Sequence, residues 1–167
     1  MKTLTDQLSQ YAQYHRSERN ILTHFIGVPM IVVAVAVLLS RPALAVGGFT
    51  LTPALPAVVA ASLFYLRLDL RFGLLLTALL AAALWFGSWA AAQSTAVWLA
   101  IGVGGFLVGW VIQFVGHHFE GRKPAFVDDV VGLLIGPLFV VAELLFLLGL
   151  CRGLKAAIES RAGATRA

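Results

Sequence analysis

Charged residues divide this chain into long apolar segments. Asp, Glu, Lys and Arg are absent from residues 20–40, 42–66 and 72–119. Residues 130–151 contain a single such residue, Glu143. A helix needs about 20 apolar residues to cross the ~30 Å core of a bilayer, so the four segments have room for one, one, two and one crossings. Runs such as Leu74-Leu75-Leu76 lack the alternation of a barrel strand, which predicts helices.

The sequence therefore predicts an all-α polytopic membrane protein. We expect four full spans, at residues 21–40, 52–66, 72–92 and 95–116. A further apolar segment, residues 130–150, contains Gly136-Pro137 and is expected to be a broken or re-entrant helix, with a fifth full span as the alternative. Residues 151–167 form a basic tail. Repeats and long linkers are absent from the sequence, so one domain over residues 1–167 is expected.

The first nineteen residues are too polar for a cleavable signal peptide and instead predict an amphipathic helix on the membrane surface. Thr3 followed by Asp6 fits a capping box. One face of this helix is expected to face inward, and it is marked by a stripe of residues at helical spacing: Leu4, Leu8, Tyr11 and His15.

Composition and charge agree with a membrane protein. Of 167 residues, 60% are hydrophobic and 12% are charged, and the mean hydropathy is +0.90. These values exclude an ordinary soluble domain and a disordered chain. The single cysteine, Cys151, excludes a disulfide framework. The net charge of +4 belongs to loops rather than to a nucleic-acid surface.

Lysine and arginine predict the orientation. The loops assigned to one side contain Lys2, Arg16, Arg19, Arg67, Arg71, Arg122 and Lys123, and the loops assigned to the other contain only Arg41. We expect the first side and both termini to be cytoplasmic, in a bacterial inner membrane or a membrane of the endoplasmic-reticulum type.

The four histidines all fall at that same side, which predicts a shared metal site. His15 and His24 flank the start of the first span, and the pair His117-His118 ends the fourth. Neutral imidazole suits iron, copper, nickel and zinc. Nine residues of continuous helix would turn His15 and His24 to opposite faces, so the chain must bend near residues 17–20, with Asn20 a candidate N-cap. His117 and His118 can share one ion only if their helix ends there.

Other polar residues lie close to the histidines. Three of them stand one helical turn before a histidine, where a side chain can orient the imidazole: Tyr11, Asn20 and Gln113. Glu120 is a candidate ligand or catalytic base, and a surface pair with Arg122 is the alternative.

Two blocks of sequence resemble the Mpo-type 2-hydroxy fatty acid dioxygenases. The first runs from Tyr14-His15-Arg16 through Asn20 and His24 to Gly27-Val28-Pro29. The second runs from Gln113-Phe114-Val115-Gly116-His117 through Glu120 to Arg122-Lys123-Pro124-Ala125. The last apolar segment, from Pro137 to Glu143, is similar to that family as well. The resemblance extends over nearly the whole chain.

This resemblance implies an iron(II)-dependent oxidation that shortens a 2-hydroxy fatty acid by one carbon with dioxygen, inside a membrane. It implies that His15, His24 and His117 are required, whereas a ligand role for His118 depends on its position alone. The cations expected to attract the carboxylate of the substrate are Arg16, Arg19, Arg122 and Lys123.

Other functions remain open from the sequence. A di-iron hydroxylase or desaturase needs about eight histidines in characteristic boxes, and this chain has four. Zinc-dependent hydrolysis with Glu120 as base is chemically feasible. A non-catalytic metal-binding or lipid-binding scaffold is the alternative outside enzymes, and the sequence does not indicate an oligomeric state.

Overall fold

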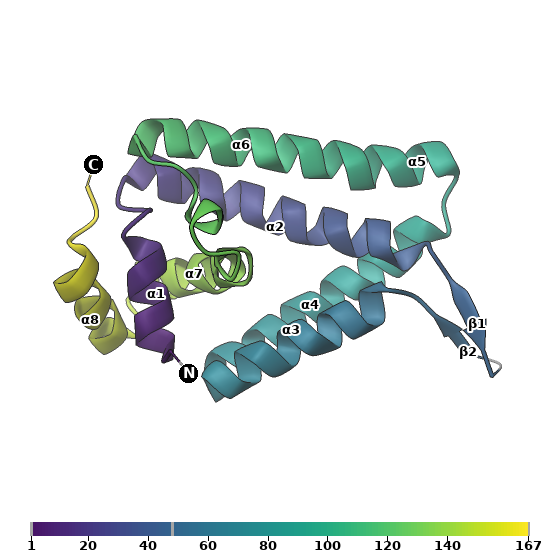
Figure 1. Ribbon diagram of the computed structural model, residues 1–167, viewed down its shortest axis with the longest axis horizontal. Coiled ribbons are helices and arrows are strands. Elements are labelled where there is room, and N and C mark those ends of the chain that lie inside the picture. Colours follow the sequence, from purple (N-terminus) through teal and green to yellow (C-terminus); the bar gives the residue numbers. More distant parts are fainter. Residues whose placement is uncertain (1, 48, 167) are drawn as a thin grey trace. The chain divides into compact units, whose positions relative to one another are not determined.

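A computed structural model describes residues 2–47 and 49–166 (Figure 1). The described chain is almost entirely helical, as predicted. Its elements in order are α1 (Leu4–Ala12), α2 (Glu18–Ser40), β1 (Leu44–Val46), β2 (Phe49–Leu51), α3 (Ala54–Leu68), α4 (Leu70–Ala91), α5 (Thr95–Leu99), the π-helical turn η1 (Ala100–Gly104), α6 (Gly105–Glu120), the 3-10 turn η2 (Ala125–Val127), α7 (Gly132–Leu147) and α8 (Arg152–Ala162).

The chain divides into two compact units. One consists of Met1–Val28 with Val111–Ala167, and the other of Pro29–Trp110. The first unit contains all four histidines, α1, α7 and α8, together with the N-terminal part of α2 and the C-terminal part of α6. The expectation of one domain remains a prediction.

Within the described residues, three helical stretches are long and apolar enough to cross a membrane: Glu18–Ser40, Leu70–Ala91 and Thr95–Glu120. A fourth candidate is the bent pair α7 and α8. These helices carry large exposed apolar side chains such as Leu74, Trp85 and Val111, as expected of surfaces that face lipid. The segment expected as a full span at residues 52–66 is instead the fifteen-residue α3, shorter than the other candidates.

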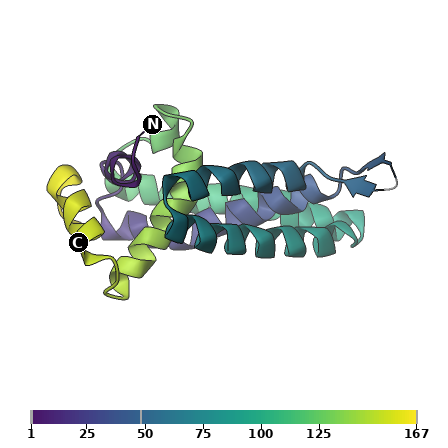
Figure 2. The same ribbon diagram turned by 90° about the horizontal axis from the view of Figure 1, so that it is seen from below.

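The unit Pro29–Trp110 contains an antiparallel helix pair and a small hairpin. α3 and α4 lie side by side (Figure 2), and the Asp69 carboxylate between them accepts hydrogen bonds from the N–H groups of Arg71 and Phe72 at the start of α4. The hairpin β1–β2 pairs Leu44 with Leu51. The hairpin lies within an apolar segment and was not predicted.

The break in the last apolar segment is not where the sequence predicted it. α7 continues through Pro137, and the chain turns by 117° between α7 and α8. Two residues in that turn have positive φ, Gly149 at 75° and Cys151 at 53°. Pro137 is the sixth residue of α7, where its missing N–H removes one bond near the start of the helix rather than in its middle.

The N-terminal helix is shorter than predicted. The Thr3–Asp6 capping box is present, but α1 ends at Ala12. Leu8 and Tyr11 of the predicted stripe are buried, and α1 contacts α7 and α8 (Figure 1). That stripe therefore packs on protein, and the position of α1 at a membrane surface remains a prediction.

The connection between α1 and α2, residues 13–17, carries His15. The predicted bend is present slightly earlier than expected. α2 begins at Glu18, so Asn20 lies inside its first turn and is not the N-cap.

Candidate metal centre

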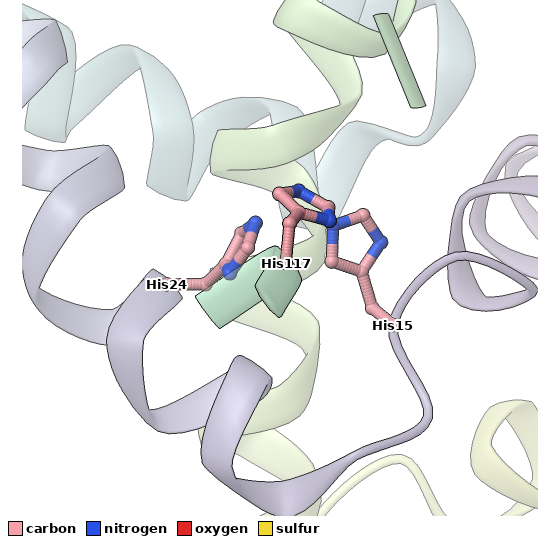
Figure 3. A group of neighbouring side chains, drawn as sticks. All are labelled: His15, His24 and His117. Carbon is pink, nitrogen blue, oxygen red and sulfur yellow. The ribbon is translucent and has the colours of Figure 1, made fainter. Parts of the chain in front are cut away.

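Three histidines from three segments meet in the unit Met1–Val28 with Val111–Ala167 (Figure 3). His15 comes from the connection, His24 from α2 and His117 from α6. All three are buried, at 0%, 2% and 7% exposure. One ligand nitrogen from each lies within 4.8 Å of the others. The ring centroid of His15 is 4.4 Å from that of His24 and 4.9 Å from that of His117.

Backbone carbonyls orient two of the imidazoles. Nδ1 of His15 lies 2.8 Å from the carbonyl oxygen of Tyr11, and Nδ1 of His24 lies 2.8 Å from that of Asn20. Burial lowers the pKa of His15 well below its ordinary value. A neutral imidazole that donates through Nδ1 presents the lone pair of Nε2, which is the form that binds a metal ion.

Aromatic rings fix the plane of His15. The ring of Tyr11 is stacked on it, with centroids 4.2 Å apart and planes 6° apart. Phe139 of α7 lies 5.4 Å from the His15 ring and 5.1 Å from the Tyr11 ring. The His15 imidazole is therefore constrained although its backbone is not helical.

The nitrogens of the cluster fit a metal ion. Nε2 of His15 and Nδ1 of His117 are buried and have no hydrogen-bond partner among the described residues. Buried polar atoms are rarely left unpaired, and a ligand is one explanation when they are. Three nitrogens that bind one ion at about 2.1 Å lie about 3.0–3.6 Å apart, so nitrogens spaced at up to 4.8 Å would move together by about 1 Å when the ion binds. Three neutral imidazoles suit iron, copper or zinc.

Glu120 holds the connection in place. Its Oε2 accepts hydrogen bonds from the backbone N–H of Arg16 at 2.9 Å and of Ser17 at 2.8 Å, and from Nδ2 of Asn20 at 3.0 Å. Its Oε1 accepts one from Nη2 of Arg166 at 2.8 Å. The carboxylate thus joins α6 to the residues that follow His15. A catalytic role for Glu120 remains a prediction.

α6 can approach α2 beside the histidines because residue 116 is glycine. A Cβ at Gly116 would lie 2.0 Å from Oγ1 of Thr23 and 2.6 Å from Oδ1 of Asn20. Thr23 is itself fixed, because its hydroxyl donates to the carbonyl of Asn20 at 2.7 Å. The bare backbone at Gly116 therefore allows His117 and His24 to meet.

Comparison with known proteins identifies the family of this chain. The family model described as 2-hydroxy-palmitic acid dioxygenase Mpo1-like matches residues 1–148. The chain belongs to the Mpo1-like family. It is 37% identical over 158 residues to the 2-hydroxy-palmitic acid dioxygenase MPO1 of Saccharomyces cerevisiae, an alignment that covers 93% of this chain and 87% of the yeast protein. The search of solved structures found no match.

In this Mpo1-like chain the cluster contains three of the four predicted ligands. α6 continues to Glu120, so adjacent side chains point about 100° apart. His118 is accordingly exposed and lies outside the cluster.

The three residues predicted to orient histidines differ in what they contact. Tyr11 orients His15 through its carbonyl and its ring. Asn20 orients His24 through its carbonyl, whereas its side chain binds Glu120. Gln113 is buried, and its Oε1 has no hydrogen-bond partner among the described residues.

The four cations predicted to attract a carboxylate occupy different environments. Arg16 is buried and its Nη2 lies 3.5 Å from Oε1 of Glu143. Arg19 is exposed, with its guanidinium 5.7 Å from the Phe119 ring centroid. Nη1 of Arg122 donates to the carbonyl of Gln13 at 2.9 Å, and Lys123 pairs with Asp128 at 2.6 Å. Their proposed role remains a prediction.

Two residues beside the site were not found from the sequence. Phe139 stands in an apolar run where nothing distinguishes it from its neighbours. Arg166 was counted only as part of a basic tail, yet its side chain binds Glu120. Contacts between residues so far apart in sequence have no local signal.

Proposed function

We propose that this chain is a 2-hydroxy fatty acid dioxygenase with an iron(II) ion held by His15, His24 and His117. The observation that supports it most directly is the buried, unpaired Nε2 of His15 in a cluster of three imidazoles. Membership of the Mpo1-like family and the activity of the yeast relative support the substrate class.

The protein's residues prepare neutral ligands. The carbonyls of Tyr11 and Asn20 keep Nδ1 of His15 and His24 protonated, so that both present Nε2. When bound, iron(II) would supply redox chemistry for dioxygen and a site that a 2-hydroxy carboxylate can chelate. Three neutral imidazoles leave the charge of a divalent ion uncompensated, which favours an anionic substrate.

Arginines near the connection would attract the acid. A hollow of about 500 Å³ is lined by residues that include Arg16, Arg122, Arg161 and Arg166. Cations that line a concave surface raise the local concentration of an anion. We assign the attraction of the substrate carboxylate to Arg122 first, because Asp6, Glu120 and Glu143 already pair with the other three arginines.

The overall reaction balances without a further reductant. The bond between the carboxyl carbon and C2 of the 2-hydroxy acid breaks, and C2 becomes the new carboxyl carbon. One 2-hydroxy acid and one dioxygen give the acid one carbon shorter, carbon dioxide and water. Dioxygen is the oxidant, and the carbon atoms of the substrate are oxidised.

The test is to purify the protein anaerobically, measure its bound metal and supply 2-hydroxypalmitic acid with oxygen. We expect iron and the fifteen-carbon acid. His24→Ala should lose both, and His118→Ala should keep both, because His118 neighbours a ligand but lies outside the cluster. Zinc without oxygen consumption would favour a hydrolase. Neither metal nor product would favour a scaffold, and full iron content in His24→Ala would exclude the proposed centre.

We also propose that the metal centre faces the cytoplasm of an integral membrane protein. The basis is the distribution of lysine and arginine together with the apolar candidate spans. The single cysteine offers a direct test, because Cys151 is exposed and free. In sealed vesicles with the periplasmic or lumenal face outward, a membrane-impermeant maleimide should label Cys151 only after permeabilisation. Labelling of intact vesicles would place Cys151 on the opposite side of the membrane and contradict the proposed orientation.

A further inference from the structure

The segment that follows α8, residues 163–166, lies against the connection that carries His15. The backbone N–H of Arg166 donates to the carbonyl of Arg16 at 2.6 Å, and the carbonyl of Arg166 accepts from the N–H of Glu18 at 2.8 Å. Ser17 and Arg166 form a parallel β-bridge. Arg166 therefore pairs with residues 16–18 as a residue of a short parallel strand would.

Side chains strengthen this pairing. Nη1 of Arg16 donates to the carbonyl of Gly163 at 2.9 Å. Nη2 of Arg166 donates to Oε1 of Glu120, whose Oε2 already accepts from the backbone of Arg16 and Ser17. The residues immediately after His15 are thus held by Glu120 on one side and by residues 163–166 on the other.

His15 depends on such support more than the other two ligands do. His24 and His117 stand on long helices, whose backbone hydrogen bonds fix their positions. His15 lies outside any helix or strand, and its backbone N–H bonds only within the turn, to Ala12. A ligand in a short connection is displaced when the connection moves, since closure of a metal site requires all ligands within a few tenths of an ångström.

We propose that residues 163–166 complete the metal centre and that Arg166 is a positioning residue for His15, acting through Glu120 and the backbone of Arg16. Arg166 contacts neither the histidines nor the substrate in this role. The inference deepens the proposed function, because it rests on His15 being a metal ligand. It also concerns residues beyond the part of the chain that the family model matches, which ends at residue 148.

The first experiment needs no metal. Diethylpyrocarbonate modifies exposed imidazoles, and mass spectrometry can follow each histidine of the metal-free protein separately. In the native chain, exposed His118 should react quickly and buried His15 slowly. In Arg166→Ala, which loses the charged hydrogen bond to Glu120, and in a chain ended after Ala162, which also loses the backbone bonds of Arg166, we expect His15 to react about tenfold faster or more. His24 should keep its rate.

Arg161→Ala is the matched control. Arg161 lies in the last turn of α8 and also pairs with a carboxylate, at 2.7 Å, but that carboxylate is Asp6 of α1. It should leave the rate of His15 unchanged, and Arg166→Lys should restore part of the protection. An unchanged His15 in the shortened chain would overturn the proposal. Equal acceleration of His15, His24 and His117 would also overturn it, since that pattern reports general loosening.

The second experiment measures the consequence for metal binding, with Co(II) as the probe. Arg166→Ala should weaken Co(II) binding about tenfold in the native background and have no effect in a His15→Ala background. An equal loss in both backgrounds would show that Arg166 acts on overall stability and would overturn the positioning role. If the native chain binds neither Co(II) nor Fe(II) while His15 protection still depends on Arg166, the metal centre is wrong and the contact between the two segments stands.

Discussion

The imidazole of His15 lies flat on the phenol ring of Tyr11, with the planes 6° apart. The same tyrosine supplies the carbonyl that binds Nδ1 of that imidazole. One residue therefore sets both the plane and the protonated nitrogen of His15, the one histidine of the cluster whose backbone lies outside a helix. Every substitution of Tyr11 keeps its backbone carbonyl, whereas only an aromatic residue keeps the stacked ring. The two contributions can therefore be separated.

We expect Tyr11→Phe to retain metal binding and Tyr11→Ala to weaken it about tenfold. The phenylalanine keeps the stacked ring, and the alanine leaves His15 free to rotate. Groups that orient a metal ligand typically contribute about 10–100-fold to affinity. Competition of a chromophoric chelator for Co(II) measures the effect. Equal affinities for the two variants would show that the stacking does not hold His15.

We expect Glu120→Gln to lose iron and turnover together. In the native chain both carboxylate oxygens of Glu120 accept hydrogen bonds, whereas glutamine has a single side-chain oxygen. The second oxygen is replaced by an NH2 group, which would face either Nη2 of Arg166 or the backbone N–H groups, and these are donors themselves. Breaking hydrogen bonds to a buried carboxylate costs about 1.5–3 kcal/mol. Metal content and rate should be measured on the same sample. A variant that keeps its iron but loses turnover would instead support the catalytic role predicted from the sequence.

We expect Gly116→Ala to destabilise the site by about 1–3 kcal/mol, because the added methyl overlaps Thr23 and Asn20. Adding Thr23→Ala removes the closer of the two contacts and should restore part of the lost metal affinity. Gly104→Ala is the matched control, since a Cβ there meets nothing within 4 Å. Thermal unfolding and metal titration of the three variants test this. Equal losses at both glycines would show that helix distortion, and not the contact, is responsible.

Acid should weaken the N-terminal cap of α1. The hydrogen bond from Thr3, reinforced by Arg161, lowers the pKa of Asp6 from 3.8 to about 2. Because the folded pKa is below the unfolded one, the stabilisation is fully present above about pH 4 and is lost as the pH falls towards 2. The difference in unfolding midpoint between the native chain and Asp6→Asn should shrink over that range. A constant difference would exclude titration of Asp6 as its cause.

The helices and the cluster of three histidines could be predicted from the sequence because both leave local signals. Long intervals without charge gave the all-α class and three of the candidate spans. The bend between His15 and His24 followed from helical geometry, because nine residues of straight helix would have separated the two side chains. The same geometry explains His118, which diverges from His117 once α6 continues to Glu120.

The remaining features depend on contacts that a local pattern does not contain. Gly136-Pro137 indicated a break, but Pro137 lies early enough in α7 to be accommodated, and Gly149 marks the turn instead. Asn20 looked like a cap, although its carbonyl orients His24 and its side chain binds Glu120. The four donors to Glu120 come from opposite ends of the chain, so its environment is a product of folding.

The order in which the three histidines are synthesised has a consequence for when the metal ion can be bound. His15 and His24 are synthesised first, His117 only after α3 and α4, and Arg166 after α8. A nascent chain with two imidazoles would hold an ion weakly and release it. The three histidines exist together only after α6 has been translated. In the proposed iron centre, the ion would therefore be bound after that point, and cells starved of iron should contain a metal-free protein that binds iron when it is supplied later.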